Sequence, residues 1–290
     1  MRVLVTGANG QLGHDVVNEL RKRKHEAITT DIAGEMDYLL DITKDSIIDK
    51  VIEINPDAII HCAAWTAVDA AEDEENKEKV YAINVTGTQN LVKAAEILNC
   101  RFLYLSTDYV FDGQGTEPWQ PDDRSYAPLC YYGQTKLEGE FAVSELRKFF
   151  IVRIAWVFGL NGKNFIRTMI NVGKTHDEVR VVNDQIGTPT YTYDLSRLLV
   201  DMIETEKYGY YHVTNEGGYI SWYEFCREIY RQAGLTTSVI PVTTDEYGLS
   251  KARRPFNSRL DKSKLSENGF ERLPDWKDAL NRYLIESGLK

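Results

Sequence analysis

The chain has 290 residues, of which 43% are hydrophobic, and a formal net charge of −10 from 34 basic and 44 acidic residues. This length and composition predict enough core for one large domain or two tightly joined ones. An acidic surface repels nucleic acid and anionic membranes, so neither is expected as a partner. An anionic ligand would have to be bound by local donors.

The four cysteines, Cys62, Cys100, Cys130 and Cys226, contain no CxxC pair. A zinc site or a disulfide framework is therefore not expected. We expect the protein to reside in a reducing compartment. The N-terminal run MRVLVTG is too short for a signal peptide, and no stretch approaches the ~20 apolar residues of a membrane span. The sequence accordingly predicts a soluble, cytoplasmic protein.

Short apolar runs alternate with helical patterns in the first half of the chain. Strands are predicted at 2–7, 26–31, 57–64, 101–107 and 149–156, and helices at 11–24, 45–54, 76–98 and 131–147. Strands that alternate with helices indicate βαβ units with right-handed crossovers. The predicted fold class is therefore α/β, with a Rossmann-type doubly wound parallel sheet.

The alternation weakens after residue 157, where short segments contain Gly, Pro and aromatic residues, as in DQIGTPTYTYD and KARRPFNSRL. We expect residues 1–157 to form the dinucleotide-binding domain and residues 158–290 to form mainly a smaller α/β substrate-binding region. No Pro-, Gly- or Ser-rich linker separates the two, so they are expected to pack tightly together.

The glycines of VLVTGANGQLG, Gly7, Gly10 and Gly13, follow the first predicted strand and enter the first helix. Glycines in such a turn let backbone amides approach a pyrophosphate at a helix N-terminus. Their GxxGxxG spacing is a variant of the dinucleotide-binding fingerprint, and the strand–turn–helix context makes the signal specific. The alternative is a structural turn without a ligand.

Asp31 ends the second predicted strand, where the fingerprint places an acid that binds the adenine-ribose hydroxyls. A carboxylate there repels a 2′-phosphate, and TTDIAG contains no Lys or Arg, so NADH is favoured over NADPH. The alternative for Asp31 is an exposed turn residue. In the next turn, Asp41 could accept from the adenine amino group while Ile42 covers the ring. A helix N-cap at Thr43 is the competing use of that segment.

The stretch LCYYGQTKLEGE places Lys136 four residues after Tyr132, on one face of a predicted helix. A phenol beside an ammonium can act as a proton donor with a shifted pKa. Ordinary packing gives the same spacing, and Tyr247 and Lys251 repeat it without such a strand before them. The fourth predicted strand runs into LSTDYVFDG, at the edge of the sheet where ligands of such folds bind.

A series of motifs resembles those of the extended short-chain dehydrogenase/reductases: TGANGQLG, CAAWTAVDAAE, INVTGT, LSTDYVFDG, YYGQTKLEGE and VRIAWVFG. Within that superfamily the chain is similar, over almost its whole length, to the dTDP-4-dehydrorhamnose reductases. GTPTYTYDL and ARRPFNSRL extend the likeness into the second part. The resemblance implies reduction of the 4-keto group of dTDP-4-dehydro-L-rhamnose by NADH or NADPH, giving dTDP-L-rhamnose for cell-wall polysaccharide.

The resemblance also implies roles for the polar residues near the reacting carbonyl. Tyr132 matches the catalytic acid, Lys136 the lysine that binds the nicotinamide ribose, and Thr107 the hydroxyl that binds the carbonyl. Lys136 and the positive charge of the oxidised nicotinamide are expected to lower the pKa of Tyr132. Tyr131 has no lysine four residues on and is expected in the wall of the site.

Further residues carry over from the same resemblance. The implied cofactor-binding residues are Gly7, Gly10, Gln11, Leu12, Gly13, Asp31, Asp41, Ile42, Ala63, Ala64, Trp65, Leu105, Tyr132 and Lys136. The implied substrate-binding residues are Thr107, Asp108, Trp156, Asn164, Phe165 and Arg254. The family often has His where this chain has Trp65, so the role of that side chain stays open. A buried core position is the alternative for Trp156, and a solvated surface charge is the alternative for Arg254.

Other classes of protein share parts of this pattern. Sugar-nucleotide dehydratases have a TDE run whose acids eliminate water, but here Tyr109 follows Asp108, so a dehydratase is not expected. A sugar-nucleotide 4-epimerase has the same tyrosine–lysine pair and is not excluded, although TDYVFDG and GTPT favour the reductase. A non-catalytic alternative is a regulatory subunit resembling that of methionine adenosyltransferase. The complete set of Thr107, Tyr132 and Lys136 favours an enzyme.

Members of the reductase family can dimerise, some with Mg²⁺ between acidic groups, so a homodimer is one expected form of the chain. Asp15 lies where the family can have an acidic metal ligand. One carboxylate near a helix start also suits the helix dipole, so no metal is predicted. The expected binding partner is a dTDP-sugar.

Overall fold

The computed structural model describes residues 1–290, and its centre is a seven-stranded sheet. The strand order is β11-β6-β5-β4-β1-β2-β3, and every neighbouring pair is parallel. The strands are β1 (Arg2–Thr6), β2 (Glu26–Asp31), β3 (Tyr38–Leu39), β4 (Ala58–His61), β5 (Arg101–Thr107), β6 (Phe149–Ile154) and β11 (Gly209–His212). Because the order runs outward from β1 in both directions, the sheet is doubly wound, which confirms the predicted α/β Rossmann-type fold.

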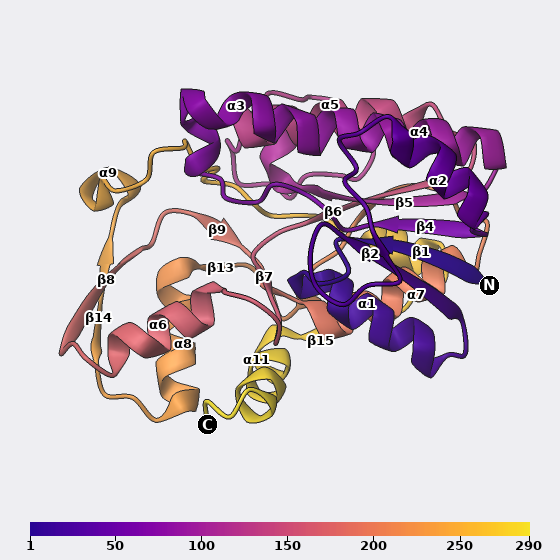
Figure 1. Cartoon of the computed structure of the whole chain (residues 1–290). Helices are drawn as coiled ribbons and strands as arrows, with labels where there is room; N and C mark the ends of the chain where they lie inside the picture. The colour runs from indigo at the N-terminus through magenta and orange to yellow at the C-terminus, as the bar shows by residue number, and fades with distance from the viewer.

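Helices cover both faces of this sheet (Figure 1). On one face lie α1 (Gln11–Lys22) and α7 (Thr192–Ile203), and on the other lie α2 (Ser46–Ile54), α4 (Gly87–Leu98) and α5 (Tyr131–Ser144). Double coverage explains why the strands read as continuous apolar runs. None of the helices combines the length and apolar composition needed to cross a membrane.

The long helix predicted at 76–98 is interrupted in the structure. α3 (Glu74–Tyr81) continues through a π-helical turn at Ala82–Thr86 into α4. The other predicted elements shift only at their ends. The strand predicted at 149–156 ends at Ile154, because the backbone of Trp156 turns away with a φ of +51°.

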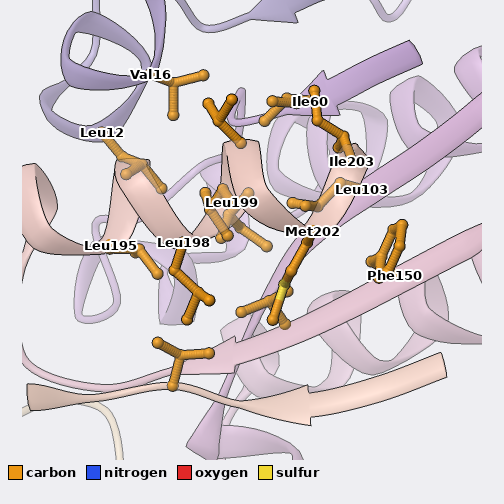
Figure 2. Close-up of a cluster of buried hydrophobic side chains, with 14 of the residues drawn as sticks. Leu12, Val16, Ile60, Leu103, Phe150, Leu195, Leu198, Leu199, Met202 and Ile203 are labelled. Atoms are coloured by element: carbon orange, nitrogen blue, oxygen red, sulfur yellow. The ribbon is translucent and has the colours of Figure 1, made fainter. Parts of the chain in front are cut away.

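The larger core lies between the sheet and the helix pair α1 and α7 (Figure 2). Its members are mostly aliphatic and almost completely buried, and each contributes roughly 1.5–3 kcal/mol by leaving water. Figure 2 labels Leu12, Val16, Ile60, Leu103, Phe150, Leu195, Leu198, Leu199, Met202 and Ile203. Since α7 comes from the second half of the chain, this core is built from both halves.

The second region is made of short strand pairs and helices beside the sheet. Its elements are β7 (Val157–Phe158), α6 (Phe165–Gly173), β8 (Glu178–Val182), β9 (Ile186–Gly187), β10 (Thr190–Tyr191), β12 (Asn215–Glu216), β13 (Ile220–Ser221), α8 (Trp222–Ala233), β14 (Ser238–Val242), α9 (Thr244–Tyr247), α10 (Ser263–Glu267), β15 (Leu273–Asp275) and α11 (Trp276–Glu286). The predicted boundary at residue 157 is not a clean one, because α7 and β11 return to the larger sheet.

A fully buried ion pair joins α5 to β6. Arg153 donates to both carboxylate oxygens of Glu140, from Nε at 2.8 Å and from Nη2 at 2.7 Å. Ser106 of β5 donates to Glu140 at 2.5 Å. Arg153 also donates to the Tyr126 hydroxyl at 3.0 Å and to the Pro121 carbonyl at 3.2 Å. The pair therefore fixes helix α5, two strands and the loop after β5 in one network.

Replacing Glu140 with Ala should lower the free energy of unfolding by about 3–5 kcal/mol, because it leaves the Arg153 guanidinium buried and unpaired. The matched control is Glu26→Ala. Glu26 pairs with Arg2 while its side chain is 57% exposed, so its loss should cost less than about 1 kcal/mol. Urea-unfolding midpoints measure both changes. Equal losses for the two variants would contradict the importance of the buried pair.

Candidate active site

A glycine turn lies at the carboxyl edge of the sheet, between β1 and α1. Gly7 has a φ of +64°, and a Cβ placed there would lie 2.7 Å from Ala63 Cα. A Cβ on Gly13 would lie 2.1 Å from the Gly7 carbonyl oxygen. No side chain caps the N-terminus of α1, so its first backbone N–H groups are available to an anion. The turn fits the cradle predicted for a pyrophosphate.

Two asparagines from the second region brace this turn. Asn161 donates to the Asn9 carbonyl at 2.7 Å, and Asn164 donates to Gln11 Oε1 at 3.1 Å. Asn164 also caps α6 by accepting from the Arg167 backbone N–H at 3.1 Å. Its amide was predicted to face the substrate nucleotide, but the structure uses it between the glycine turn and α6.

The predicted adenosine residues lie at the ends of β2 and β3. Asp31 accepts from the backbone N–H groups of Asn9, at 3.1 Å, and Ile32, at 2.7 Å, which fixes its carboxylate beside the glycine turn. Asp41 accepts from the backbone N–H and the hydroxyl of Thr43, at 3.0 and 2.7 Å. The alternative use of this segment, a helix N-cap at Thr43, is not what the structure shows, because α2 begins at Ser46 and its N-cap residue is Asp45.

The other predicted cofactor contacts differ in exposure. Ile42 is 6% exposed and belongs to the core beside α4, and Leu105 is 8% exposed and belongs to the core beside α7. Ala63 and Ala64 are half-buried after β4. Together with the glycine turn, the two alanines outline a continuous path along the carboxyl edge of the sheet.

Thr107 ends β5 at the centre of this edge. Its hydroxyl donates to Asp108 Oδ1 at 3.0 Å, and Ser258 of the second region donates to Asp108 Oδ2 at 2.5 Å. Burial raises the pKa of Asp108 to about 6, although both hydrogen bonds oppose the shift. Each carboxylate oxygen thus accepts one hydrogen bond within the chain, which joins Asp108 to Thr107 and Ser258. The predicted contact of Asp108 with the substrate stays a prediction.

Tyr132 lies on the first turn of α5, facing the end of β5. Its ring meets the ring of Tyr109 edge-on, with centroids 5.7 Å apart. Burial, followed by the charge of Asp108, raises the pKa of Tyr132, and Lys136 is not among the groups that shift it. In the cofactor-free protein this pKa is thus raised, and the predicted lowering, which also relied on the positive nicotinamide, stays a prediction for the complex. A neutral phenol is the form that a proton donor needs.

Lys136 follows one turn later and is 3% exposed. Its ammonium lies over the Tyr104 ring, 4.0 Å from the centroid, and makes no hydrogen bond to the chain. Burial lowers the pKa of Lys136 to about 7, opposed by the charge of Glu140. A buried cation without acceptors is unfavourable, so this site fits a ligand that supplies them, as ribose hydroxyls do.

The helix turn that carries Tyr132 and Lys136 is fixed by a neighbouring side chain that was not identified from the sequence. Asn84, in the π-helical turn, accepts from the Trp65 backbone N–H at 2.8 Å and donates to the Thr135 hydroxyl at 3.0 Å. This turn could not be predicted, because the segment INVTGT that contains it has an ordinary helical pattern. Tyr131, expected in the wall of the site, instead directs its hydroxyl to the Lys77 carbonyl of α3, at 3.4 Å.

A cavity of about 310 Å³ lies mainly in the second region and is connected to Tyr132 through Tyr109, which accepts from Arg254 of the cavity lining. Its lining is aromatic and aliphatic with a few charged or polar groups: Asp69, Phe165, Met169, Arg180, Val181, Val182, Gln185, Trp222, Tyr247, Leu249, Ser250 and Arg254. Phe165 and Arg254 are among the residues predicted to bind substrate. Asn164 is not among the lining residues.

Arg254 is held within this lining. It donates to Asp69 at 2.6 Å and to the Tyr109 hydroxyl at 3.2 Å, so the alternative of a solvated surface charge is wrong. Trp156 is half-buried and stacks on Trp222, with ring centroids 3.8 Å apart. A positive φ is rare for an aromatic residue and is found mainly where structure or function over-determines it.

The remaining predicted features lie outside the site. Asp15 is buried between α1 and α7 and accepts from the Thr192 hydroxyl at 2.5 Å. No group of three or more His, Cys, Asp or Glu side chains is arranged to hold a metal ion. The helix α9 ends at Tyr247, and Lys251 pairs with Asp73, so this second tyrosine–lysine pair does not share a helix face.

The fold and this arrangement of Thr107, Tyr132 and Lys136 define an extended short-chain dehydrogenase/reductase. Comparison with known proteins narrows the class further. The chain belongs to the family described as the RmlD substrate binding domain, whose model matches residues 1–288.

Relatives of the chain are similar over almost their whole length. The spore coat polysaccharide biosynthesis protein SpsK of Bacillus subtilis is 38% identical over 286 residues, covering 98% of this chain and 97% of the relative. The crystal structure of a dTDP-4-dehydrorhamnose reductase from Clostridium acetobutylicum is 43% identical, with a TM-score of 0.92 and 99% of both chains covered. The crystal structure of the dTDP-4-dehydrorhamnose reductase from Bacillus anthracis, in complex with NADP, is 42% identical, with a TM-score of 0.91. The match covers 98% of this chain and 99% of that one.

The buried position of Lys136 predicts how stability depends on pH. The pKa of Lys136 is about 7 in the folded protein and has a reference value of 10.5, so folding releases a proton between these pH values. In the cofactor-free protein the free energy of unfolding should therefore gain up to about 1.4 kcal/mol per pH unit from this group as pH rises above 7. Lys136→Met should abolish that gain.

Urea unfolding between about pH 7.5 and 9 measures the difference between wild type and variant. Subtracting the two curves removes the groups that both proteins share. Lys93→Met, on the exposed face of α4, is the matched control and should follow the wild type. Parallel curves for wild type and Lys136→Met would show that Lys136 is not buried as described.

Proposed function

We propose that the chain is an NADH- or NADPH-dependent dTDP-4-dehydrorhamnose reductase, which converts dTDP-4-dehydro-L-rhamnose to dTDP-L-rhamnose. The observation that carries the proposal is the position of Thr107, Tyr132 and Lys136 at the carboxyl edge of the sheet. The glycine turn suited to a dinucleotide lies on the same edge. The cavity lined by aromatic and cationic side chains is joined to Tyr132 through Tyr109, which packs on Tyr132 and accepts from Arg254 of the lining. Near-full-length relatives carry this activity in their names.

Each residue of the site has a separate role in the proposed reduction. A bound reduced nicotinamide supplies the hydride to the 4-keto carbon. In the cofactor-free protein the single hydroxyl proton of Thr107 goes to Asp108 Oδ1, and Ser258 holds the other oxygen of that carboxylate. When the substrate binds, the Thr107 hydroxyl turns to donate to the carbonyl oxygen, and Tyr132 donates the proton that this oxygen gains. Lys136 binds the ribose hydroxyls, which gives its buried ammonium the acceptors that it lacks in the chain.

The residue beside Thr107 and Asp108 supports a reductase over a dehydratase. Tyr109 stands where elimination of water would need a second acid, and its hydroxyl accepts from Arg254 at 3.2 Å. Its burial raises the pKa of this phenol well above the neutral range. Tyr109 is thus a neutral anchor for Arg254, and no carboxylate stands at this position to take the proton that an elimination must remove.

We further propose that NADH is the preferred cofactor. Asp31 lies beside the glycine turn, and residues 32–43 contain no Lys or Arg to neutralise a 2′-phosphate. The Bacillus anthracis relative was crystallised with NADP, so the preference has to be measured on this chain.

The first experiment follows the absorbance of the reduced nicotinamide in separate samples of NADH and NADPH with the 4-keto sugar nucleotide. Oxidation of the cofactor with formation of dTDP-rhamnose supports the proposal. Interconversion of 4-epimeric sugars without net oxidation would indicate an epimerase. Cofactor binding without turnover of any 4-keto sugar would indicate a regulatory protein.

Tyr132→Phe should lower kcat by roughly 10²–10⁴, because it removes the positioned proton donor while keeping the ring. The dissociation constant of the cofactor should stay near the wild-type value. Tyr131→Phe is the matched control, since its hydroxyl points to α3, and it should keep kcat close to wild type. A fully active Tyr132→Phe enzyme would overturn the mechanism.

Asp31→Ala should lower the ratio of kcat/KM for NADH over NADPH by roughly tenfold or more, since it removes a like charge from the site of the 2′-phosphate. Glu35→Ala, an exposed acid in the same loop, controls for the general loss of one negative charge. Steady-state kinetics with both cofactors give the ratios. If both variants keep the wild-type ratio, Asp31 is not the ribose ligand.

A further inference from the structure

A buried glutamine with a fixed orientation lines the 310 Å³ cavity. Gln185 is 4% exposed, and its Nε2 donates to the Thr244 hydroxyl oxygen at 3.0 Å. That hydroxyl donates to Asp184 Oδ1 at 2.6 Å. A hydroxyl has one proton and a carboxylate only accepts, so the Thr244 oxygen must accept from the Gln185 amide. The hydrogen-bond relay Asp184–Thr244–Gln185 therefore prevents the amide from flipping.

This orientation leaves two polar groups of Gln185 unused by the chain. Oε1 accepts no hydrogen bond from the protein and is not enclosed by it, and the second hydrogen of Nε2 is also free. Because Gln185 is otherwise buried, its accessible edge is the one that lines the cavity. The cavity thus contains an acceptor and a donor side by side, in an order that cannot reverse.

The rest of the lining offers one aromatic surface to a flat ring. Phe165 and Trp222 pack against each other, with centroids 4.6 Å apart and ring planes at 54°, and Met169 and Tyr247 add further apolar surface. Arg180 and Arg254 line the same cavity as its two cationic groups, and Arg254 is paired there with Asp69 at 2.6 Å. Arg180 and the remaining donors of Arg254 are thus the groups that a diphosphate can use. An aromatic surface, a polar edge and cationic groups together match a nucleoside diphosphate.

We propose that Gln185 recognises the 2,4-dioxopyrimidine edge of a thymine or uracil base, and that the relay through Thr244 and Asp184 makes the site reject cytosine. This inference rests on the proposed function and specifies how the nucleotide of the same site is selected. A dioxopyrimidine presents an N3–H donor beside carbonyl acceptors, which pair with Oε1 and the free Nε2 hydrogen. Cytosine presents an N3 acceptor beside an amino donor, which would require the flipped amide.

The relay also places α9. Thr244 is the first residue of this helix, and its backbone N–H donates to Asp184 Oδ2 at 2.9 Å. Tyr247, one turn on, lines the cavity. The backbone contact to Asp184 does not involve the hydroxyl, so a variant without the hydroxyl keeps the anchor of α9. This separates base recognition from the folding of the segment.

The test compares the dissociation constants of dTDP and dCDP for the full chain, measured by calorimetry. The wild type should bind dTDP about 10–100-fold more tightly, the range for a good two-point base contact. Thr244→Val should bring the ratio close to one, because the Gln185 amide can then turn. Thr244→Ser keeps the hydroxyl and should keep the ratio. A wild type without preference, or a preference unchanged in Thr244→Val, would overturn the inference.

A second variant guards against a local disturbance of α9. Gln185→Leu should weaken dTDP binding by about tenfold or more, while NADH binding, which uses other residues, stays at the wild-type value. An unchanged dissociation constant for dTDP would overturn the role of Gln185. Turnover of the 4-keto sugar by the wild type, measured in the same preparation, separates the two proposals. If the wild type turns over the 4-keto sugar but the Gln185 and Thr244 variants keep its dissociation constants for dTDP and dCDP, only the proposed base recognition is overturned. If the wild type neither turns over the sugar nor binds dTDP, the proposed function and the base recognition are both overturned.

Discussion

The parallel direction of all seven strands is the constraint on which the site depends. In such a sheet every carboxyl end lies on one edge, and the helices that follow begin there with their N-termini toward the ligand. The glycine turn after β1, Asp31 at the end of β2, the alanines after β4 and Thr107 at the end of β5 come together for this reason. Residues far apart in the chain therefore meet without any long-range pairing of their own.

The second region completes this edge with polar contacts at several points. Ser258 binds Asp108, Asn164 binds Gln11, and Arg254 binds Tyr109 and Asp69. Each contact joins a residue after residue 157 to one before it. The carboxylate that accepts from Thr107 is itself held by a serine 150 positions away. The smaller region therefore helps to position the residues at the carboxyl edge of the sheet.

Features with a local origin could be predicted from the sequence. The strand–turn–helix glycines, the parallel α/β class and the tyrosine–lysine spacing rest on neighbouring residues and periodicity. Features that arise only in three dimensions could not. The return of β11 and α7 to the sheet, the π-helical turn at Asn84 and the use of Asn164 as a brace have no local signal. The raised pKa of Tyr132 in the cofactor-free protein also has no local signal, because it comes mainly from burial.

The buried pair of Glu140 and Arg153 has an evolutionary consequence. Loss of either charge alone strands the other in the core, whereas joint replacement by apolar residues of similar volume is often neutral or stabilising. A lineage can therefore leave this arrangement only through a badly destabilised intermediate or by a simultaneous double change. The two positions, one on a helix and one on a strand, should be inherited as a single unit, together with the loop that Arg153 holds.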